Sequence, residues 1–307
     1  MIAFLLRRLA SAVPTLLVIV TVAFFMMRVA PGGPFDQDRA LSPDIEANIL
    51  RAYNLDKPLV EQYFDYVGNL LVGDFGPSYK IRDFDVNDLI AAGLPASLQL
   101  GGSAILLAIL LGISFGTLAA LRQNQTSDYV IMTVAMVGIA VPNFVMAPLL
   151  TLVFGVYLPL LPVAGWGDGA FVNKILPVIA LALPQIAYIA RLTRGSMVEV
   201  LNTNYVRTAR AKGLREQLVV VRHALKGALL PVVSYLGPAT AGLVTGSVVI
   251  ETIFDIPGIG RYFVQGALNR DYTLVMGVMV FYAVLIIVLN LLVDVIYVFL
   301  DPKVRHS

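Results

Sequence analysis

The sequence of 307 residues has no cysteine and only two histidines, and these absences remove several kinds of chemistry. Without cysteine there can be no disulfide framework, thiolate nucleophile or cysteine-ligated metal. His223 and His306 stand in hydrophilic segments, so a serine–histidine dyad inside an apolar helix is excluded. A phosphate-cradling Gly-x-x-x-x-Gly-Lys loop and a His-Glu-x-x-His zinc motif are missing as well. We therefore expect no catalytic residue, metal ion or cofactor in this chain.

Charged residues are also scarce, at 14% of the sequence against about 25% in a soluble domain. The formal net charge of +2 gives no polyelectrolyte character, which argues against nucleic acid as a partner. Apolar residues reach 58% and the mean hydropathy is +0.81, more than a soluble globule of this size could bury. The composition predicts a protein embedded in a lipid bilayer.

Charge-free stretches locate the membrane-crossing helices, because a span needs about 20 apolar residues and a central charge costs about 2.5–3.5 kcal/mol. The first stretch is too long for a cleaved signal peptide, so we expect it to remain as an anchor. The sequence predicts an all-α polytopic membrane protein whose six transmembrane helices lie roughly at 9–29, 97–121, 129–155, 174–193, 227–250 and 274–298.

The fourth span is the shortest. Lys174 and Arg191 enclose 16 residues, about 24 Å of helix against a hydrocarbon core of about 30 Å. Pro184 weakens this span further, as Pro142 weakens the third. Such residues are tolerated at membrane depth where protein packs around them or a water-filled path passes. We therefore expect spans three and four to be interior, where they could line a pathway.

The distribution of basic residues sets the orientation. Residues 191–226 hold eight Lys/Arg against two Glu, whereas residues 31–95 hold eleven Asp/Glu against five Lys/Arg. We therefore place 191–226 and both chain termini in the cytoplasm. Residues 31–95 are expected to form an external subdomain with helical patterns from Ser42 to Tyr53 and from Lys57 to Leu71, and 251–273 an external loop.

The cytoplasmic segment 194–226 is the most informative part of the chain. A short basic helix is expected there, ended by Gly213, and a second amphipathic stretch leads from Arg215 back to the membrane. Small residues at Ala209 and Ala211 allow another protein's backbone to approach, and arginines can bind carboxylates through two parallel hydrogen bonds. Positive charge lying on anionic lipid is the competing interpretation. The residue types alone leave both open.

Three features within the spans bear on packing. Asp294 is the one acid near a span, and its place close to the inner interface favours capping or pairing with a neighbouring helix over proton coupling. The pairs Gly112/Gly116 and Gly242/Gly246 predict close helix packing, either within the chain or between subunits.

Two kinds of transporter fit these observations. One is a passive pathway subunit driven by a separate ATPase through the 194–226 segment, and the other is a secondary transporter coupled to an ion gradient. The second would require more charge within the spans or paired broken helices in two related halves, and the sequence shows neither convincingly. Composition and topology favour the first and leave the second open.

The same segment resembles the ATPase-coupling loop of binding-protein-dependent ABC importer permeases, whose pattern is Glu-Ala-Ala-x-x-x-Gly followed by an apolar residue-x-Leu-Pro. Arg207, Thr208 and Lys226 depart from that general pattern and are instead similar to the family's peptide/nickel branch. The resemblance assigns ATPase coupling to ten consecutive residues, which are Tyr205, Val206, Arg207, Thr208, Ala209, Arg210, Ala211, Lys212, Gly213 and Leu214.

Shorter fragments in the same order extend the resemblance over essentially the whole chain, among them Gly73 to Ser78, Pro257 to Gly260 and Asp301 to Lys303. The stretch 75–94 is most similar to the B permeases of oligopeptide importers. Dipeptide, glutathione and nickel permeases of the same family are less similar.

The resemblance implies the type I ABC importer permease architecture and a place in the bacterial inner membrane. The implied function is translocation of oligopeptides, or alternatively of dipeptides, glutathione or nickel. The implied partners are a second homologous permease, two ATPase subunits that use ATP and Mg, and a periplasmic peptide-binding protein. That protein would meet the external pieces 31–95 and 251–273, while the residues that contact the substrate stay unassigned.

Overall fold

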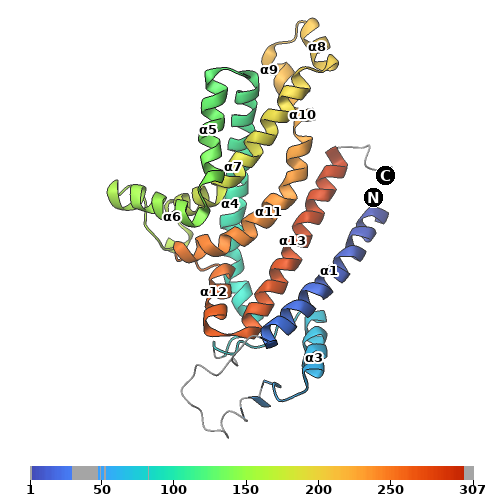
Figure 1. The fold of residues 1–307 in the computed structure, drawn as a ribbon, viewed down its shortest axis with the longest axis vertical. Helices are drawn as coiled ribbons and strands as arrows, with labels where there is room; N and C mark the ends of the chain where they lie inside the picture. Colours follow the sequence, from blue (N-terminus) through green and yellow to red (C-terminus); the bar gives the residue numbers. More distant parts are fainter. Residues whose placement is uncertain (1, 30–47, 49, 52, 82, 301–307) are drawn as a thin grey trace. The chain divides into compact units, whose positions relative to one another are not determined.

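The computed structural model describes residues 2–29, 48, 50–51, 53–81 and 83–300. These residues form helices and turns, together with one isolated bridge between Pro77 and Asp85, so the all-α fold class is confirmed (Figure 1). The chain divides into two compact units. Among the described residues, the first unit comprises 96–256 and 286–300, and the second comprises the residues up to 95 and 257–285.

Most helices belong to the first unit. They are α4 (Val86–Leu121) from Ala96 onward, α5 (Thr126–Ala140), α6 (Asn143–Leu150), α7 (Phe171–Leu201), α8 (Asn204–Ala211), α9 (Glu216–Leu218), α10 (Leu225–Ala228), α11 (Leu230–Ile253) and the end of α13 (Tyr272–Leu300). Two π-helical stretches, Thr151–Tyr157 and Val219–Ala224, continue α6 and α9. The second unit contains α1 (Ile2–Val29), α3 (Leu59–Leu71), α12 (Ile259–Asn269) and the beginnings of α4 and α13.

By length and apolar composition, five helices of the described residues could cross a membrane, namely α1, α4, α7, α11 and α13. The α5–α6 pair makes a sixth if it counts as one span, although its two parts meet at 107°. The bend falls at Val141 and Pro142, because proline restricts the residue before it and lacks a backbone donor. The structure thus breaks the span expected over 129–155 into two parts.

α7 is the central helix of the first unit, with eleven buried residues and its most extensive packing against α5 and α11. Its 31 residues run about 46 Å and pass Pro177 and Pro184 without interruption. The helix therefore extends beyond the expected 174–193 at both ends. Neighbouring helices pack around it, as expected for a span whose charge-free stretch is shorter than the hydrocarbon core.

Glycines let the backbones of α4 and α7 approach closely. A Cβ on Gly112 would lie 2.7 Å from Cβ of Ile189, and a Cβ on Gly116 would lie 2.5 Å from the carbonyl oxygen of Ala190. Both distances are too short for any side chain, so only glycine fits. The Gly112/Gly116 pair therefore packs helices within this chain.

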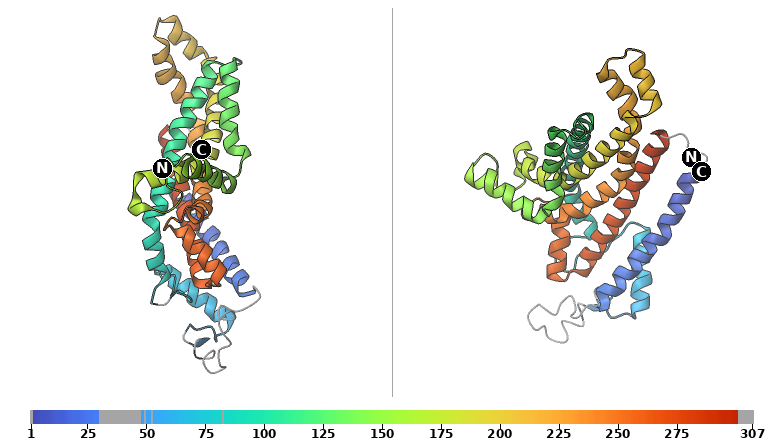
Figure 2. Two further views of the ribbon diagram at one scale, coloured as in Figure 1. Left: turned by 90° about the vertical axis from the view of Figure 1, so that its left-hand side faces the viewer. Right: turned by 45° about the horizontal axis from the view of Figure 1, so that its top comes forward.

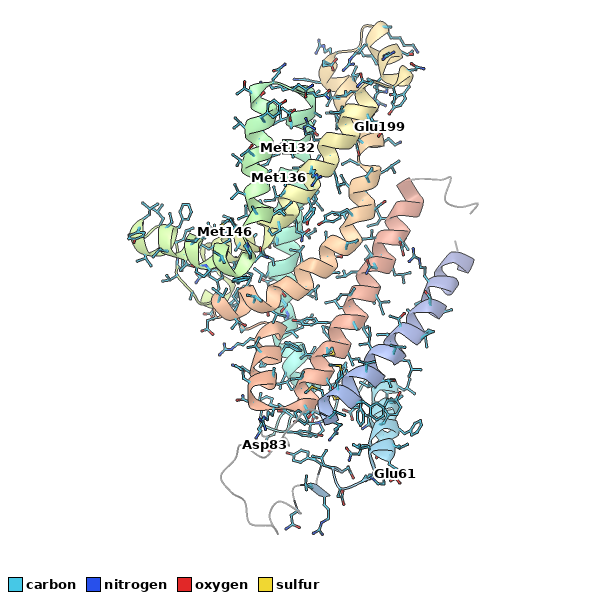
Figure 3. All side chains as sticks on the ribbon, viewed as in Figure 1. Glu61, Asp83, Met132, Met136, Met146 and Glu199 are labelled. Carbon is cyan, nitrogen blue, oxygen red and sulfur yellow. The ribbon has the colours of Figure 1, made fainter. Side chains whose placement is uncertain are left out.

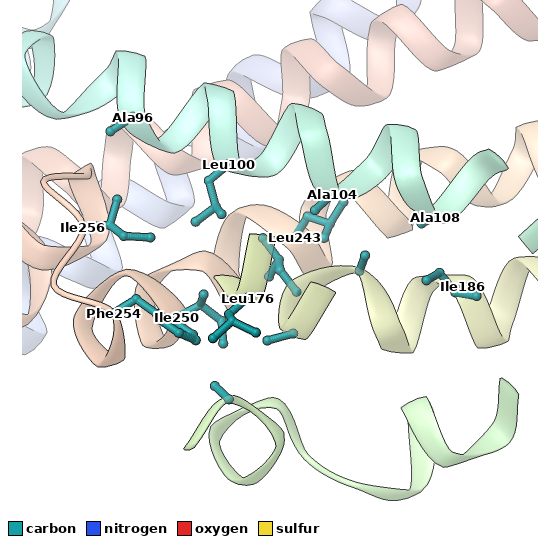
Figure 4. Close-up of a cluster of buried hydrophobic side chains, with 14 of the residues drawn as sticks. Ala96, Leu100, Ala104, Ala108, Leu176, Ile186, Leu243, Ile250, Phe254 and Ile256 are labelled. Carbon is teal, nitrogen blue, oxygen red and sulfur yellow. The ribbon is translucent and has the colours of Figure 1, made fainter. Parts of the chain in front are cut away.

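The apolar core of the first unit lies where α4, α7 and α11 meet (Figure 4). Three of the four buried α4 residues in this core are alanines, which lets the larger side chains of α7 and α11 fill the space without separating the backbones. The labelled core residues are Ala96, Leu100, Ala104, Ala108, Leu176, Ile186, Leu243, Ile250, Phe254 and Ile256.

The third span is less interior than expected. Met132 and Met136 of α5 and Met146 of α6 are half-buried (Figure 3), whereas few residues of either helix are fully buried. Apolar side chains such as Val134 and Phe144 are exposed. Within this chain α7 rather than α5–α6 is the interior helix, since α5 and α6 are covered on one side only.

The second unit differs from expectation in the 251–273 stretch, which contains α12 rather than loop alone. α12 packs closely on the beginning of α4, because a Cβ on Gly93 would lie 2.8 Å from the backbone nitrogen of Ile259. Arg270 ends the helix in the left-handed conformation, with φ of 57°. α3 follows the expected pattern from Lys57 to Leu71, whereas the pattern from Ser42 to Tyr53 lies mostly outside the described residues.

Candidate functional site: the α8–α9 projection

α8 and α9 project from the end of α7 and α10 in the first unit, as all three ribbon views show (Figures 1 and 2). Glu199, labelled in Figure 3, lies on the last turns of α7 just before this projection. α8 ends at Ala211, and Gly213 follows with φ of +74°, a left-handed conformation that glycine adopts without strain. The short helix expected from the sequence, with Gly213 after its end, is therefore present.

The inner face of α8 packs on the chain itself. Val206 and Ala209 are buried against a cluster that includes Met197 of α7 and Val219 and Ala224 of the π-helical stretch. The small size of Ala209 therefore serves packing within the chain, which corrects the expectation that it admits a partner's backbone. Ala211, in contrast, is exposed and available for such an approach.

Arg210 links the two short helices through hydrogen bonds at their exposed side. Its Nε and Nη2 donate to the two carboxylate oxygens of Glu216 over 3.2 and 2.7 Å, and its Nη1 donates to the carbonyl of Leu201 over 3.5 Å. The hydrogen bond from Arg210 lowers the pKa of the Glu216 carboxyl, and the carboxylate in turn raises the pKa of Arg210. The two-pronged guanidinium expected to bind a partner's carboxylate is thus engaged within the projection.

The ten residues assigned to coupling form one continuous segment with a buried side and an exposed side. Val206 and Ala209 are buried and Leu214 is half-buried. The exposed members are Tyr205, Arg207, Thr208, Arg210, Ala211, Lys212 and Gly213. The exposed side combines cationic and small side chains, which suits a pocket with acidic lining in another protein.

An ion pair with a buried carboxylate lies near the end of α7 from which the projection starts. Arg194 donates from Nε and Nη2 to the two oxygens of Asp128 at the start of α5, each over 2.6 Å. The backbone N–H of Asn124 donates to the same carboxylate over 3.0 Å. Sequence reasoning placed Arg194 in a loop and missed this pair, because the partners lie 66 residues apart.

Two further residues expected to take part in helix packing, Gly242 and Asp294, lie within the first unit. Gly242 faces α7, since a Cβ there would lie 3.4 Å from Nε2 of Gln185. The side chain of Asn290 of α13 packs directly on Gly237 of α11. Asp294, one turn further along α13, is half-buried and interacts with other groups.

Long apolar helices joined by a packed, projecting amphipathic segment are typical of an integral membrane protein. The chain belongs to the binding-protein-dependent transport system inner membrane component family, whose model matches residues 112–306. The model for the N-terminal part of the same membrane components matches residues 1–100.

Full-length relatives agree with this membership. The chain is 54% identical over 306 residues to the oligopeptide transport system permease protein OppB of Salmonella typhimurium, and 53% identical to OppB of Escherichia coli K12, covering 100% of each chain. It is 45% identical to the dipeptide transport system permease protein DppB of Bacillus subtilis, over 98% of this chain and 97% of that one.

Among solved structures, the chain is similar to a subunit of the MetNI methionine ABC transporter in inward-facing conformations. The TM-score is 0.59 at 16% identity, and the match covers 69% of this chain and 96% of that one. At this identity the likeness concerns the fold alone. It confirms the expected architecture of an ABC importer permease.

Proposed function

We propose that this chain is the transmembrane permease subunit of an ATP-driven importer, which moves oligopeptides delivered by a periplasmic binding protein into the cytoplasm. The α8–α9 projection carries this proposal, because its exposed side is shaped and charged for a partner while its buried side is anchored on α7. The 54% identity to an OppB permease over the full chain favours oligopeptides over dipeptides, glutathione or nickel.

Residues 205–214 dock a separate ATPase subunit, which binds and hydrolyses ATP with Mg. A displacement of α8 would move α7, because Val206 and Ala209 pack in the same cluster as Met197 of that helix. α7 in turn contacts α4 through glycines, so the helices respond as a packed group rather than by bending singly. ATP binding outside the chain thus biases an equilibrium between two arrangements of the spans.

A second homologous permease completes the pathway, and a second ATPase subunit serves it. The exposed apolar side chains of α5 and α6 suit contact with lipid or with that second permease, since water would not accommodate them. The pieces that the sequence predicts to be external, 31–95 and 251–273, receive the binding protein.

The docking step is tested by Ala211→Glu in the reconstituted four-subunit transporter. Ala211 is exposed on α8, so the new side chain alters the docking side without disturbing the buried cluster. We expect ATP-dependent peptide uptake to be lost and the ATPase subunits to dissociate during purification. Gln123→Glu, which adds the same charge on the exposed turn after α4, is the matched control and is expected to transport normally.

Normal uptake by the Ala211→Glu transporter would contradict docking through α8. The ion-coupled alternative is tested with the purified permease alone in vesicles. Accumulation of peptide there under an ion gradient, without ATPase subunits, would overturn the proposed function as a whole.

A further inference from the structure

α3 of the second unit presents an apolar stripe on its outer side. Val60, Phe64 and Leu71 are 61%, 66% and 84% exposed, and Val67 between them is half-buried. Steps of four, three and four residues place these side chains on one side of the helix. A row of large apolar side chains that the described chain leaves uncovered marks a surface where something other than water is bound.

The other two sides of α3 have different chemistry. Glu61, Asp65 and Asn69 are exposed and form a polar side, since they follow one another at steps of four. Tyr63 and Tyr66 face the protein, where their rings contact α1. α3 is therefore a helix with one side on protein, one polar side and one free apolar side. Helices that lie in the surface of a bilayer combine a polar and an apolar side in this way.

The contact between α3 and α1 shows at what depth α3 lies (Figure 1). The hydroxyl of Tyr63 is 2.7 Å from Oγ1 of Thr21, and its ring stacks on Phe25 with the centroids 5.6 Å apart. Arg28, the basic residue in the last turn of α1, comes seven residues after Thr21 and three after Phe25. At 1.5 Å per residue these are about 10 and 5 Å along the helix. Tyr63 is thus level with the last apolar turns of a candidate span, not beyond them.

The apolar stripe continues the exposed apolar surface of α1. Val22, Phe25 and Met26 of α1 are exposed at the level of this contact. The ring of Tyr63 stacks on Phe25 and meets Phe64 edge to face, with the centroids 5.4 Å apart. An unbroken aromatic surface therefore runs from the side of a membrane-crossing helix onto the stripe of α3. Whatever surrounds α1 at this depth also reaches α3.

We propose that the apolar stripe of α3 is embedded among the lipid acyl chains of the leaflet at the C-terminal end of α1. The charge distribution predicts this to be the outer leaflet. The polar side lies among the headgroups, and Tyr63 occupies the boundary that tyrosine favours. The depth of about 5–10 Å is that of interfacial helices. A soluble binding protein would not reach side chains level with the last turns of a span, which favours lipid as the occupant.

This proposal does not rest on ATP-driven import, because it requires only that α1 crosses the membrane. Its consequence is that α3 fixes the height of the predicted external piece against the bilayer. A binding protein that meets this piece would then approach the membrane surface itself.

The absence of cysteine allows a direct test, since one introduced cysteine is the only labelling site of the chain. Phe64→Cys carries a nitroxide label, and the full chain is measured in phosphatidylcholine nanodiscs, alone and again together with its partner subunits. Paramagnetic resonance compares how often the label collides with oxygen, which concentrates among acyl chains, and with a water-soluble nickel chelate. We expect the label to collide several-fold more with oxygen in both samples.

Leu71→Cys is a second reporter on the same stripe and is expected to show the same preference. Glu61→Cys is the matched control, because it is exposed on the polar side of the same helix. Its label should collide mainly with the nickel chelate. The unfolding temperature of each labelled variant, compared with that of the unmodified chain, checks that the fold is kept.

Two results would overturn the proposal. A preference for the nickel chelate at Phe64 or Leu71 would place the stripe in water. Few collisions with either reagent would mean that protein covers it. A second permease would cover the stripe in the assembled sample before the binding protein is added, whereas the binding protein would cover it only afterwards. Peptide uptake by the same labelled transporters is measured separately, so failure of the lipid contact is distinguishable from failure of import.

Discussion

The α4–α7 contact and the α8–α9 projection both depend on small residues, but in opposite ways. Gly112 and Gly116 bring two long helices so close that no side chain fits between them. A Cβ on Gly213 would meet nothing within 4 Å, so this glycine serves only to reverse the chain after α8. The α4–α7 contact therefore acts on the folding of the protein, whereas the α8–α9 projection forms a surface that another protein can contact.

The largest effect is expected for Gly116→Leu, because its Cβ would lie 2.5 Å from a backbone oxygen of α7 that cannot move aside. Separating α4 from α7 should destabilise the protein by about 3 kcal/mol, measured as the free energy of unfolding in detergent. Gly102→Ala in the same helix is the control, since a Cβ there meets nothing within 4 Å. A stable Gly116→Leu protein would show that this contact does not determine folding.

Arg194→Leu is expected to have the next largest effect. It leaves the carboxylate of Asp128, which is 1% exposed, without its partner. We expect about 2 kcal/mol of destabilisation, less than the roughly 3–5 kcal/mol of a fully buried pair, because Arg194 is itself 29% exposed. The double variant with Asp128→Leu should recover much of the loss. Equal loss in the single and double variants would contradict this account of the pair.

Gly213→Pro tests the projection rather than the core. Proline holds φ near −65° and cannot adopt the +74° observed, so the turn after α8 must change. We expect uptake by the assembled transporter to be abolished while the unfolding temperature of the permease changes little. Gly213→Asn, which tolerates the left-handed conformation, should retain most of the uptake. Unfolding of the permease by Gly213→Pro would erase the proposed distinction between the two regions.

The smallest effect is expected from the Arg210–Glu216 pair, which is largely exposed and contributes less than about 1 kcal/mol. Because the pKa of Glu216 is lowered in the folded protein, the contribution is complete above the ordinary glutamate pKa. It is lost as the pH falls through the lowered value. In the unmodified protein, hydrogen exchange of the α8 amides, corrected for intrinsic rates, should be faster at acidic than at neutral pH. In Glu216→Gln, the corrected exchange should not change with pH.

The sequence revealed the helices and the projection because both depend on local patterns. Gaps between charged residues marked the apolar helices, and a basic stretch ended by Gly213 marked α8. The sequence placed the end of α7 too early, at 193, because Arg191 was counted as the end of the charge-free stretch. The ion pair that allows Arg194 to remain in the helix joins distant parts of the chain.

The second unit also contains a cavity of about 160 Å³, which lay beyond sequence reasoning for the same cause. Its lining comes from five separate stretches of the chain, at 24–28, 53–54, 62–69, 75–79 and 272–276. The break in the third span, in contrast, carried a visible signal at Pro142. That proline was recognised as a weakness of the span and not as its end.

Trp166 lies in the first unit, where Nζ of Lys174 stands 5.2 Å from its ring while also donating to Oε1 of Gln99 over 2.9 Å. The sequence contains no second tryptophan. The tryptophan fluorescence of the permease therefore comes from one indole, which lies just before α7. Any rearrangement that moves this helix away from α4 would change the emission of an unlabelled protein, which makes the working cycle observable in real time.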